Sequence, residues 1–266
     1  MATHTAETHA HAAHTEHAEH AHDWHWSWAP AAISVGILLL TVSLQMYLVY
    51  EAKMMGIIFA GLGTPLILLG VANWMGSPGV TGPTVMYLNS LTLTLFIVSE
   101  GLIFFAMFIA YYALRINAGM QDAPWPPAGT PEINQVLALI SLGVMVLSSL
   151  IYHLAVKSFK EGGSGFSFLV LLAIILGAAF VGSTFYEWSH LSAEGFKPGT
   201  NAYSTPFYAL TGVHVAHVLV GLGAFLFIFF GNMFGRVHEA FVKLAGVYWY
   251  FVTGASFFVV TQVYFW

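Results

Sequence analysis

The residue with the clearest potential for chemistry is Glu100, a single acid inside a long apolar segment. The segment Leu88–Leu114 is apolar over 27 residues, or roughly 40 Å as a helix, which is long enough to cross a bilayer. A carboxylate at that depth costs several kcal/mol unless it is protonated, paired or hydrated. Glu100, next to Ser99, is therefore either a functional intramembrane acid or a protonated group that hydrogen-bonds to a neighbouring helix.

A second candidate is a pair of histidines in the sequence Thr211-Gly-Val-His-Val-Ala-His-Val218. His214 and His217 are three residues apart, so a helix projects both from the same face. Such a pair could bind haem or copper if ligands on facing helices completed the site. The other embedded histidine, His153, is expected near the end of its helix and supplies no such set. Hydrogen bonding between helices is therefore the favoured interpretation of the pair.

Two further polar residues, Glu187 and His190, end the fifth apolar segment. Residues at that boundary are often solvated helix ends, which is the favoured interpretation, and a functional role is the alternative. No nucleophile–base pair and no phosphate-binding loop accompanies them.

The first 28 residues form a polar tail that is rich in histidine. Metal binding, proton buffering near neutral pH and a disordered lead-in to the membrane all remain possible for this tail. Its histidines are His4, His9, His11, His14, His17, His20, His22 and His25.

The composition identifies the solvent of the protein as largely lipid. Of the 266 residues, 58% are hydrophobic and only 7% are charged, against about 25% charged in an ordinary soluble domain. The absence of cysteine excludes disulfides and thiolate metal sites. Seven Lys and Arg against twelve Asp and Glu provide no basic stripe for nucleic acid.

Seven apolar segments predict an all-α, polytopic membrane protein. We expect a tail over 1–28, two transmembrane helices over 29–75, a Gly/Pro-rich loop over 76–86 and five helices over 87–266. The segments are Pro30–Tyr50, Met54–Trp74, Leu88–Leu114, Ile133–Val156, Phe166–Tyr186, Tyr203–Gly231 and Phe241–Trp266.

The basic residues of the short loops give a weak indication of orientation. Seven spans place four Lys and Arg on the side of the N-terminus and three on the other side, which favours a cytoplasmic N-terminus. The four are Lys157, Lys160, Arg236 and Lys243, and the three are Lys53, Arg115 and Lys197.

Several short motifs, in order along the chain, resemble those of cytochrome c oxidase subunit III. Each motif is modest by itself, but the ordered set extends over nearly the whole chain. The motifs are Ser99-Glu-Gly-Leu-Ile-Phe-Phe105, Trp125-Pro-Pro127, Phe185-Tyr-Glu187, Thr211-Gly-x-His-x-x-His-Val218 and Tyr248-Trp-x-Phe-Val252.

The resemblance implies an accessory subunit of the respiratory haem-copper oxidase in a bacterial plasma membrane. In that family two helices and five helices enclose a cleft filled with phospholipid, and the N-terminus faces the cytoplasm. Haem and copper reside in partner subunits and none in this chain. The implied partners are catalytic subunit I, subunit II and other respiratory-complex subunits. The implied roles are to stabilise the catalytic subunit and to support proton uptake during electron transport to dioxygen.

The last segment departs from the family pattern at three positions. Tyr250 and Thr253 stand where relatives commonly have His and Asp, and Lys243 stands where an acidic residue is common. We expect hydroxyl groups to replace an ionic tie here, because hydroxyls cost less to bury than ions. Tyr250 is predicted to hydrogen-bond to the sixth segment or to a backbone carbonyl, and Lys243 to reach the membrane surface.

Two other functions compete with a cytochrome c oxidase subunit. One is subunit III of a quinol oxidase or of a nitric-oxide-reductase-associated relative. The other, from a different class, is a small proton or ion transporter that uses Glu100 and the histidine pair directly. A subunit is expected to purify with haem-bearing partners, whereas a transporter is expected to act alone.

Overall fold

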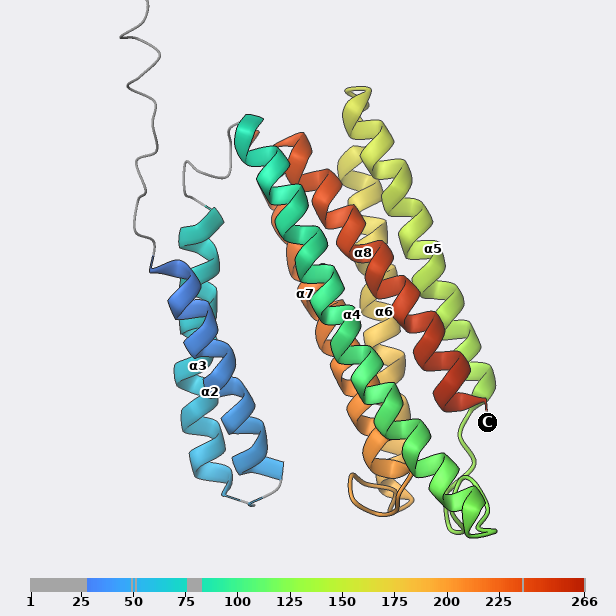
Figure 1. The fold of residues 1–266 in the computed structure, drawn as a ribbon. Helices are drawn as coiled ribbons and strands as arrows, with labels where there is room; N and C mark the ends of the chain where they lie inside the picture. The colour runs from blue at the N-terminus through green and yellow to red at the C-terminus, as the bar shows by residue number, and fades with distance from the viewer. Residues whose placement is uncertain (1–27, 49, 51, 76–82, 236, 266) are drawn as a thin grey trace, which may run out of the picture. The chain divides into compact units, whose positions relative to one another are not determined.

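The computed structural model describes residues 28–48, 50, 52–75, 83–235 and 237–265. The predicted all-helical class is confirmed for these residues, which contain seven α-helices and no strand (Figure 1). The helices are α2 (Ala29–Leu48), α3 (Lys53–Met75), α4 (Pro83–Met120), α5 (Gln135–Lys160), α6 (Phe166–Ala193), α7 (Ser204–Met233) and α8 (Glu239–Val259), with a π-helical turn, η2 (Val260–Tyr264), after the last.

Six of these helices, α3 to α8, contain a stretch that is long and apolar enough to cross a membrane. Within α2 the described residues give a shorter apolar helix, Ala29–Ser43. The helices extend beyond most of the predicted segments. In particular, α4 begins at Pro83, inside the stretch 76–86 that was expected to be loop, and α6 continues to Ala193.

The chain divides into two compact units, Met1–Gly82 and Pro83–Trp266. The first unit is the antiparallel hairpin of α2 and α3. In this hairpin the helices approach closely at glycine: a Cβ on Gly63 would lie 2.8 Å from the carbonyl oxygen of Gly36. Small residues permit such contacts between membrane helices.

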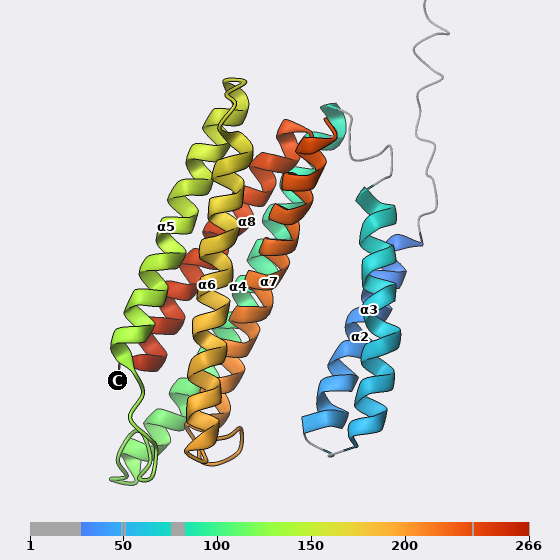
Figure 2. The same cartoon turned by 180° about the vertical axis from the view of Figure 1, so that it is seen from behind.

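The second unit is a bundle of α4 to α8. Helix α8 packs against α4, α5 and α7, whereas α6 packs against α5 and α7 (Figures 1 and 2). Asn134 begins α5, because its side-chain oxygen accepts a hydrogen bond from the backbone N–H of Leu137 at 2.9 Å.

The core of this bundle centres on Trp249, which is fully buried. Its indole ring lies against bare backbone on two helices. A Cβ on Gly221 would come within 2.5 Å of two ring carbons, and one on Gly177 within 3.0 Å of the ring. Phe225 packs against the same ring, with centroids 4.7 Å apart, and stacks on Tyr152 at 3.9 Å. These contacts fix α6, α7 and α8 relative to one another.

Candidate functional site

The structure joins Glu100 on α4 to His217 on α7. The Oε2 atom of Glu100 lies 3.0 Å from Nε2 of His217, and the two side chains are only 18% and 14% exposed. The expected hydrogen bond from the membrane acid to a neighbouring helix is therefore present. Pairing of this kind removes most of the cost of placing a carboxyl group at membrane depth.

The hydrogen bonds of His217 define where its protons lie. Its Nδ1 atom is 2.7 Å from the carbonyl oxygen of Val213. A carbonyl only accepts, so Nδ1 carries a hydrogen. One further proton then lies between Nε2 and Glu100, either on the carboxyl group or on the imidazole. Glu100 and His217 therefore form a pair that shares one proton and has no net charge in either form.

Aromatic side chains surround this pair. The ring of Phe104 lies 5.2 Å from that of His217, and Phe251 lies 6.3 Å from it. The hydroxyl of Tyr248 donates to the carbonyl oxygen of His217 at 3.1 Å. Ser99, in contrast, is exposed and donates to the carbonyl oxygen of Phe96 in its own helix. Ser99 therefore joins no helices among the described residues.

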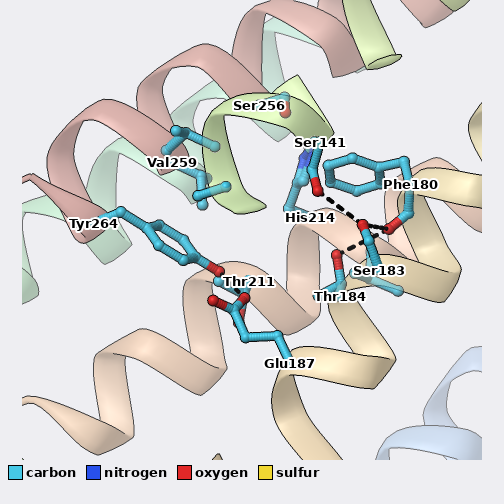
Figure 3. A pocket seen from close by; sticks show the side chains of 13 residues that line it. Ser141, Phe180, Ser183, Thr184, Glu187, Thr211, His214, Ser256, Val259 and Tyr264 are labelled. Carbon is cyan, nitrogen blue, oxygen red and sulfur yellow. Dashed lines mark hydrogen bonds between the residues drawn. The ribbon is translucent and has the colours of Figure 1, made fainter. Parts of the chain in front are cut away.

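His214 points to a different part of the bundle than His217. It is 2% exposed, and it lines a cavity formed by α5, α6, α7, α8 and η2 (Figure 3). The edges of Phe180 and Phe104 contact its ring. The two histidines therefore do not converge on one ligand site.

Glu187 also lines this cavity, and the interpretation of Glu187 as a solvated helix end is wrong. Because α6 continues to Ala193, Glu187 lies within the helix and is 7% exposed. Its Oε2 atom accepts a hydrogen bond from the hydroxyl of Tyr264 at 2.6 Å. His190, one turn later, is exposed and lies 3.5 Å from Glu194.

Two of the three departures in the last helix form hydrogen bonds to α5. Tyr250 hydrogen-bonds to Nδ1 of His153 at 3.0 Å, and Thr253 hydrogen-bonds to Ser149. The prediction for Tyr250, a bond to the sixth span or to a backbone carbonyl, is therefore wrong, because the hydroxyl bonds to a histidine side chain on α5. Lys243 pairs with Glu239 at 2.5 Å, and both side chains remain about half exposed.

Comparison with known proteins decides the family. The model of the family "Cytochrome c oxidase subunit III" matches residues 19–266. The chain belongs to the cytochrome c oxidase subunit III family. The family is that of a subunit of cytochrome c oxidase, a respiratory enzyme complex.

Individual relatives show the same similarity. The chain is 34% identical to a probable cytochrome c oxidase subunit 3 of Nocardia farcinica, over 60% of this chain and 79% of the relative. It is 32% identical to cytochrome c oxidase subunit 3 of Thermostichus vulcanus, over 61% and 79% of the two chains. It is also 33% identical to cytochrome bo(3) ubiquinol oxidase subunit 3 of Pseudomonas aeruginosa, over 45% and 56%.

The structure shows what the proline motif of this family does in the loop after α4. Trp125 packs against two buried tyrosines, with its ring centre 5.7 Å from those of Tyr111 and Tyr203. The same loop is tied to the start of α7, because Asn201 donates to the hydroxyl of Thr130 at 2.9 Å. The motif therefore holds the ends of α4 and α7 together.

Within the part of the chain that the structure describes, no group of three His, Asp or Glu side chains could hold a metal ion. The eight histidines of the tail lie outside the described residues. Tyr264 and Ser256 are site residues that sequence reasoning missed, because the sequence contains no sign of which helix faces they meet.

Proposed function

We propose that this chain is the accessory, non-redox subunit of its oxidase and stabilises catalytic subunit I, with subunit II and other respiratory-complex subunits nearby. Haem and copper then belong to partner subunits. The observation that supports this most directly is the family match over residues 19–266.

Purification through an affinity tag on this chain tests the proposal. We expect the tagged chain to bring with it subunits that contain haem and copper, with the visible spectrum of an oxidase. The chain expressed alone is expected to show no Soret band. A Soret band from the chain alone, or a tagged chain that purifies alone but moves protons in vesicles, would support a redox protein or a transporter instead.

The electron donor of the complex is proposed to be cytochrome c. The relatives from Nocardia farcinica and Thermostichus vulcanus are named for that donor, whereas the Pseudomonas aeruginosa relative is named for ubiquinol. Oxygen consumption by the purified complex separates the two. Turnover with reduced cytochrome c is expected, and turnover with quinol alone would assign the complex to the quinol oxidases.

Support of proton uptake is proposed for two parts of the chain. Glu100 and His217 share one proton at low exposure. The histidines of the tail are able to bind protons near neutral pH, since the ordinary pKa of histidine is about 6.5.

Deletion of residues 3–23 tests the role of the tail. The variant is expected to lose turnover mainly above neutral pH, where free protons are scarce and a proton-binding surface matters most. The matched control keeps the tail and replaces with glutamine the seven histidines that the deletion removes. If the control behaves like the wild type while the deletion does not, the tail acts through its length rather than through its histidines.

Bound phospholipid is proposed to fill a cleft between the two-helix unit and the five-helix unit. The division of the chain after Gly82 supports the separation into two and five helices. Native mass spectrometry of the complex is expected to show lipid retained by this subunit, and lipid-free subunit III would contradict the cleft.

The membrane is proposed to be the bacterial plasma membrane, with the N-terminus in the cytoplasm and the C-terminus on the opposite side. The apolar helices and the membrane-bound family support the location, and the loop charges support the orientation. A reporter that is active only outside the cytoplasm, fused after Trp266, is expected to be active. The same reporter fused within the tail is expected to be inactive.

A further inference from the structure

The cavity beside His214 is lined by both polar and apolar side chains. Side chains from α5, α6, α7, α8 and η2 line it, and all five elements contribute hydroxyl, carboxyl or imidazole groups. The cavity has a volume of about 20 Å³. This is room for about one or two water molecules. The polar lining residues are Ser141, Ser183, Thr184, Glu187, Thr211, His214, Ser256 and Tyr264.

Most of these polar groups already have protein partners. Ser141 and Ser183 hydrogen-bond to each other at 2.8 Å. Thr184 and Thr211 each donate to a carbonyl oxygen four residues earlier in the same helix. Tyr264 donates to Glu187. These side chains line the cavity, and their hydrogen bonds are already made to protein groups.

Four buried atoms on the wall have no hydrogen-bond partner among the described residues. They are Oε1 of Glu187, Oγ of Ser256 and both ring nitrogens of His214. Buried polar atoms in proteins are nearly always satisfied by protein or by ordered water. A neutral histidine offers one donor and one acceptor, and serine offers both. Water, with two hydrogens and two lone pairs, matches this mixed set, whereas a metal ion or an anion would match only half of it.

A second, open hollow has one lining residue in common with the cavity. The hollow is lined by the segment 132–137, by Tyr186 and by His190 and Leu191, and Glu187 lines both spaces. In Figure 3 the pair of Glu187 and Tyr264 lies at one end of the lining side chains, and His214 and Ser256 lie at the other.

We propose that this cavity is a binding site for one or two water molecules, which enter past Glu187 and connect its carboxyl group to His214 and Ser256. The waters give the buried imidazole of His214 hydrogen-bond contact with the hollow. This site is separate from the Glu100 and His217 pair and does not depend on the proposed role in proton uptake.

A single cysteine tests for water directly, because the chain contains none of its own. Ser256→Cys changes one atom and places a thiol on the cavity wall. The S–H stretching band absorbs where other protein groups do not, and it moves when deuterium replaces hydrogen. Infrared spectra of the purified full-length chain after transfer to D₂O therefore measure how fast water reaches position 256.

The matched control is Ser148→Cys. Ser148 is fully buried and donates to the carbonyl oxygen of Ala173 at 2.9 Å, away from the cavity. We expect the thiol at 256 to exchange roughly tenfold faster or more than the thiol at 148, since buried groups away from water exchange only through local opening. Ser141→Cys repeats the measurement from the α5 wall of the cavity, so that the test does not depend on one variant.

The second arm tests the route. Glu187→Leu in the Ser256→Cys chain is expected to slow exchange at 256 toward the rate of the control. Equal rates at positions 256, 141 and 148 would show a dry cavity and overturn the proposal. Fast exchange at 256 that Glu187→Leu leaves unchanged would overturn entry past Glu187. Circular dichroism of each variant confirms that helix content is retained.

Discussion

The two histidines of α7 lie three residues apart and differ in their hydrogen-bond partners. His217 reaches across to α4 and forms a hydrogen bond with Glu100, whereas His214 faces a cavity among the other helices and has no protein partner for either nitrogen in the described residues. Three residues of an α-helix turn by about 300°, which leaves the two side chains about 60° apart. In a tightly packed bundle that angle is enough to place neighbouring residues against different helices.

The comparison separates two ways of burying an ionisable group. The pair of Glu100 and His217 is satisfied within the protein, so its members depend on each other. In the cavity, one carboxyl oxygen of Glu187 accepts a hydrogen bond from Tyr264. Its other oxygen and both ring nitrogens of His214 have no hydrogen-bond partner among the described residues. Substitutions are therefore expected to be costly where a partner is left behind and mild where none exists.

The largest effect is expected at Glu187. Glu187→Leu removes the acceptor of Tyr264, whose side chain is only 4% exposed. Leaving a buried hydroxyl without a partner costs about 1–3 kcal/mol, and we expect the upper part of that range. Glu187→Gln keeps an acceptor and is expected to cost less than about 1 kcal/mol. Thermal unfolding of the purified complex measures both, and equal losses would show that shape alone matters here.

The next effect is expected at Glu100. Glu100→Leu leaves Nε2 of His217 without a partner, at a cost of about 1–2 kcal/mol because the pair is partly exposed. Glu100→Gln is expected to leave folding and assembly intact, since the amide can donate to Nε2. Recovery of the assembled complex is the measurement. Loss of the complex in the Gln variant would show that the acid itself, rather than the hydrogen bond, is required.

The two histidines can be compared by the same substitution. His217→Phe leaves Glu100 unpaired and is expected to destabilise by about 1–2 kcal/mol. His214→Phe leaves no protein group without a partner, and we expect a change within about 1 kcal/mol. The order of the two unfolding temperatures tests the comparison. A larger loss for His214→Phe than for His217→Phe would reverse it.

The smallest effect is expected at Tyr250. Its ring is 40% exposed and its hydroxyl bonds to the exposed His153. Tyr250→Phe is therefore expected to cost no more than about 1 kcal/mol. Thr253→Val, which removes a more buried bond to Ser149 on the same pair of helices, is the matched comparison. A larger effect at Tyr250 than at Thr253 would indicate that position 250 contacts another subunit.

The sequence predicts the membrane class and the existence of seven helices because apolar length is a local property. It also predicts that Glu100 needs a partner, since the cost of a lone carboxyl group in lipid does not depend on the fold. That His217 rather than His214 is this partner depends on the rotation of α7 against α4. The hydrophobic pattern of one helix does not determine how that helix is rotated against its neighbour.

The failures have a similar physical origin. Glu187 was compatible with a solvated helix end because the polar residues after Tyr186 hide the continuation of α6 to Ala193. Tyr250 was expected to face the sixth span, whereas the antiparallel packing of α5 and α8 places Ser149 and His153 opposite Thr253 and Tyr250. In both cases the outcome depends on contacts between residues more than 70 positions apart, which periodicity does not report.

The contact of Trp249 with Gly177 and Gly221 has a mechanical consequence. The indole ring rests on bare backbone on both sides, and interiors this dense compress very little. Helix α8 therefore has no free space in which to slide along α7 or to turn about its own axis. A force on one end of α8 is therefore expected to move α6 and α7 together with it, so that the three helices respond as one rigid body.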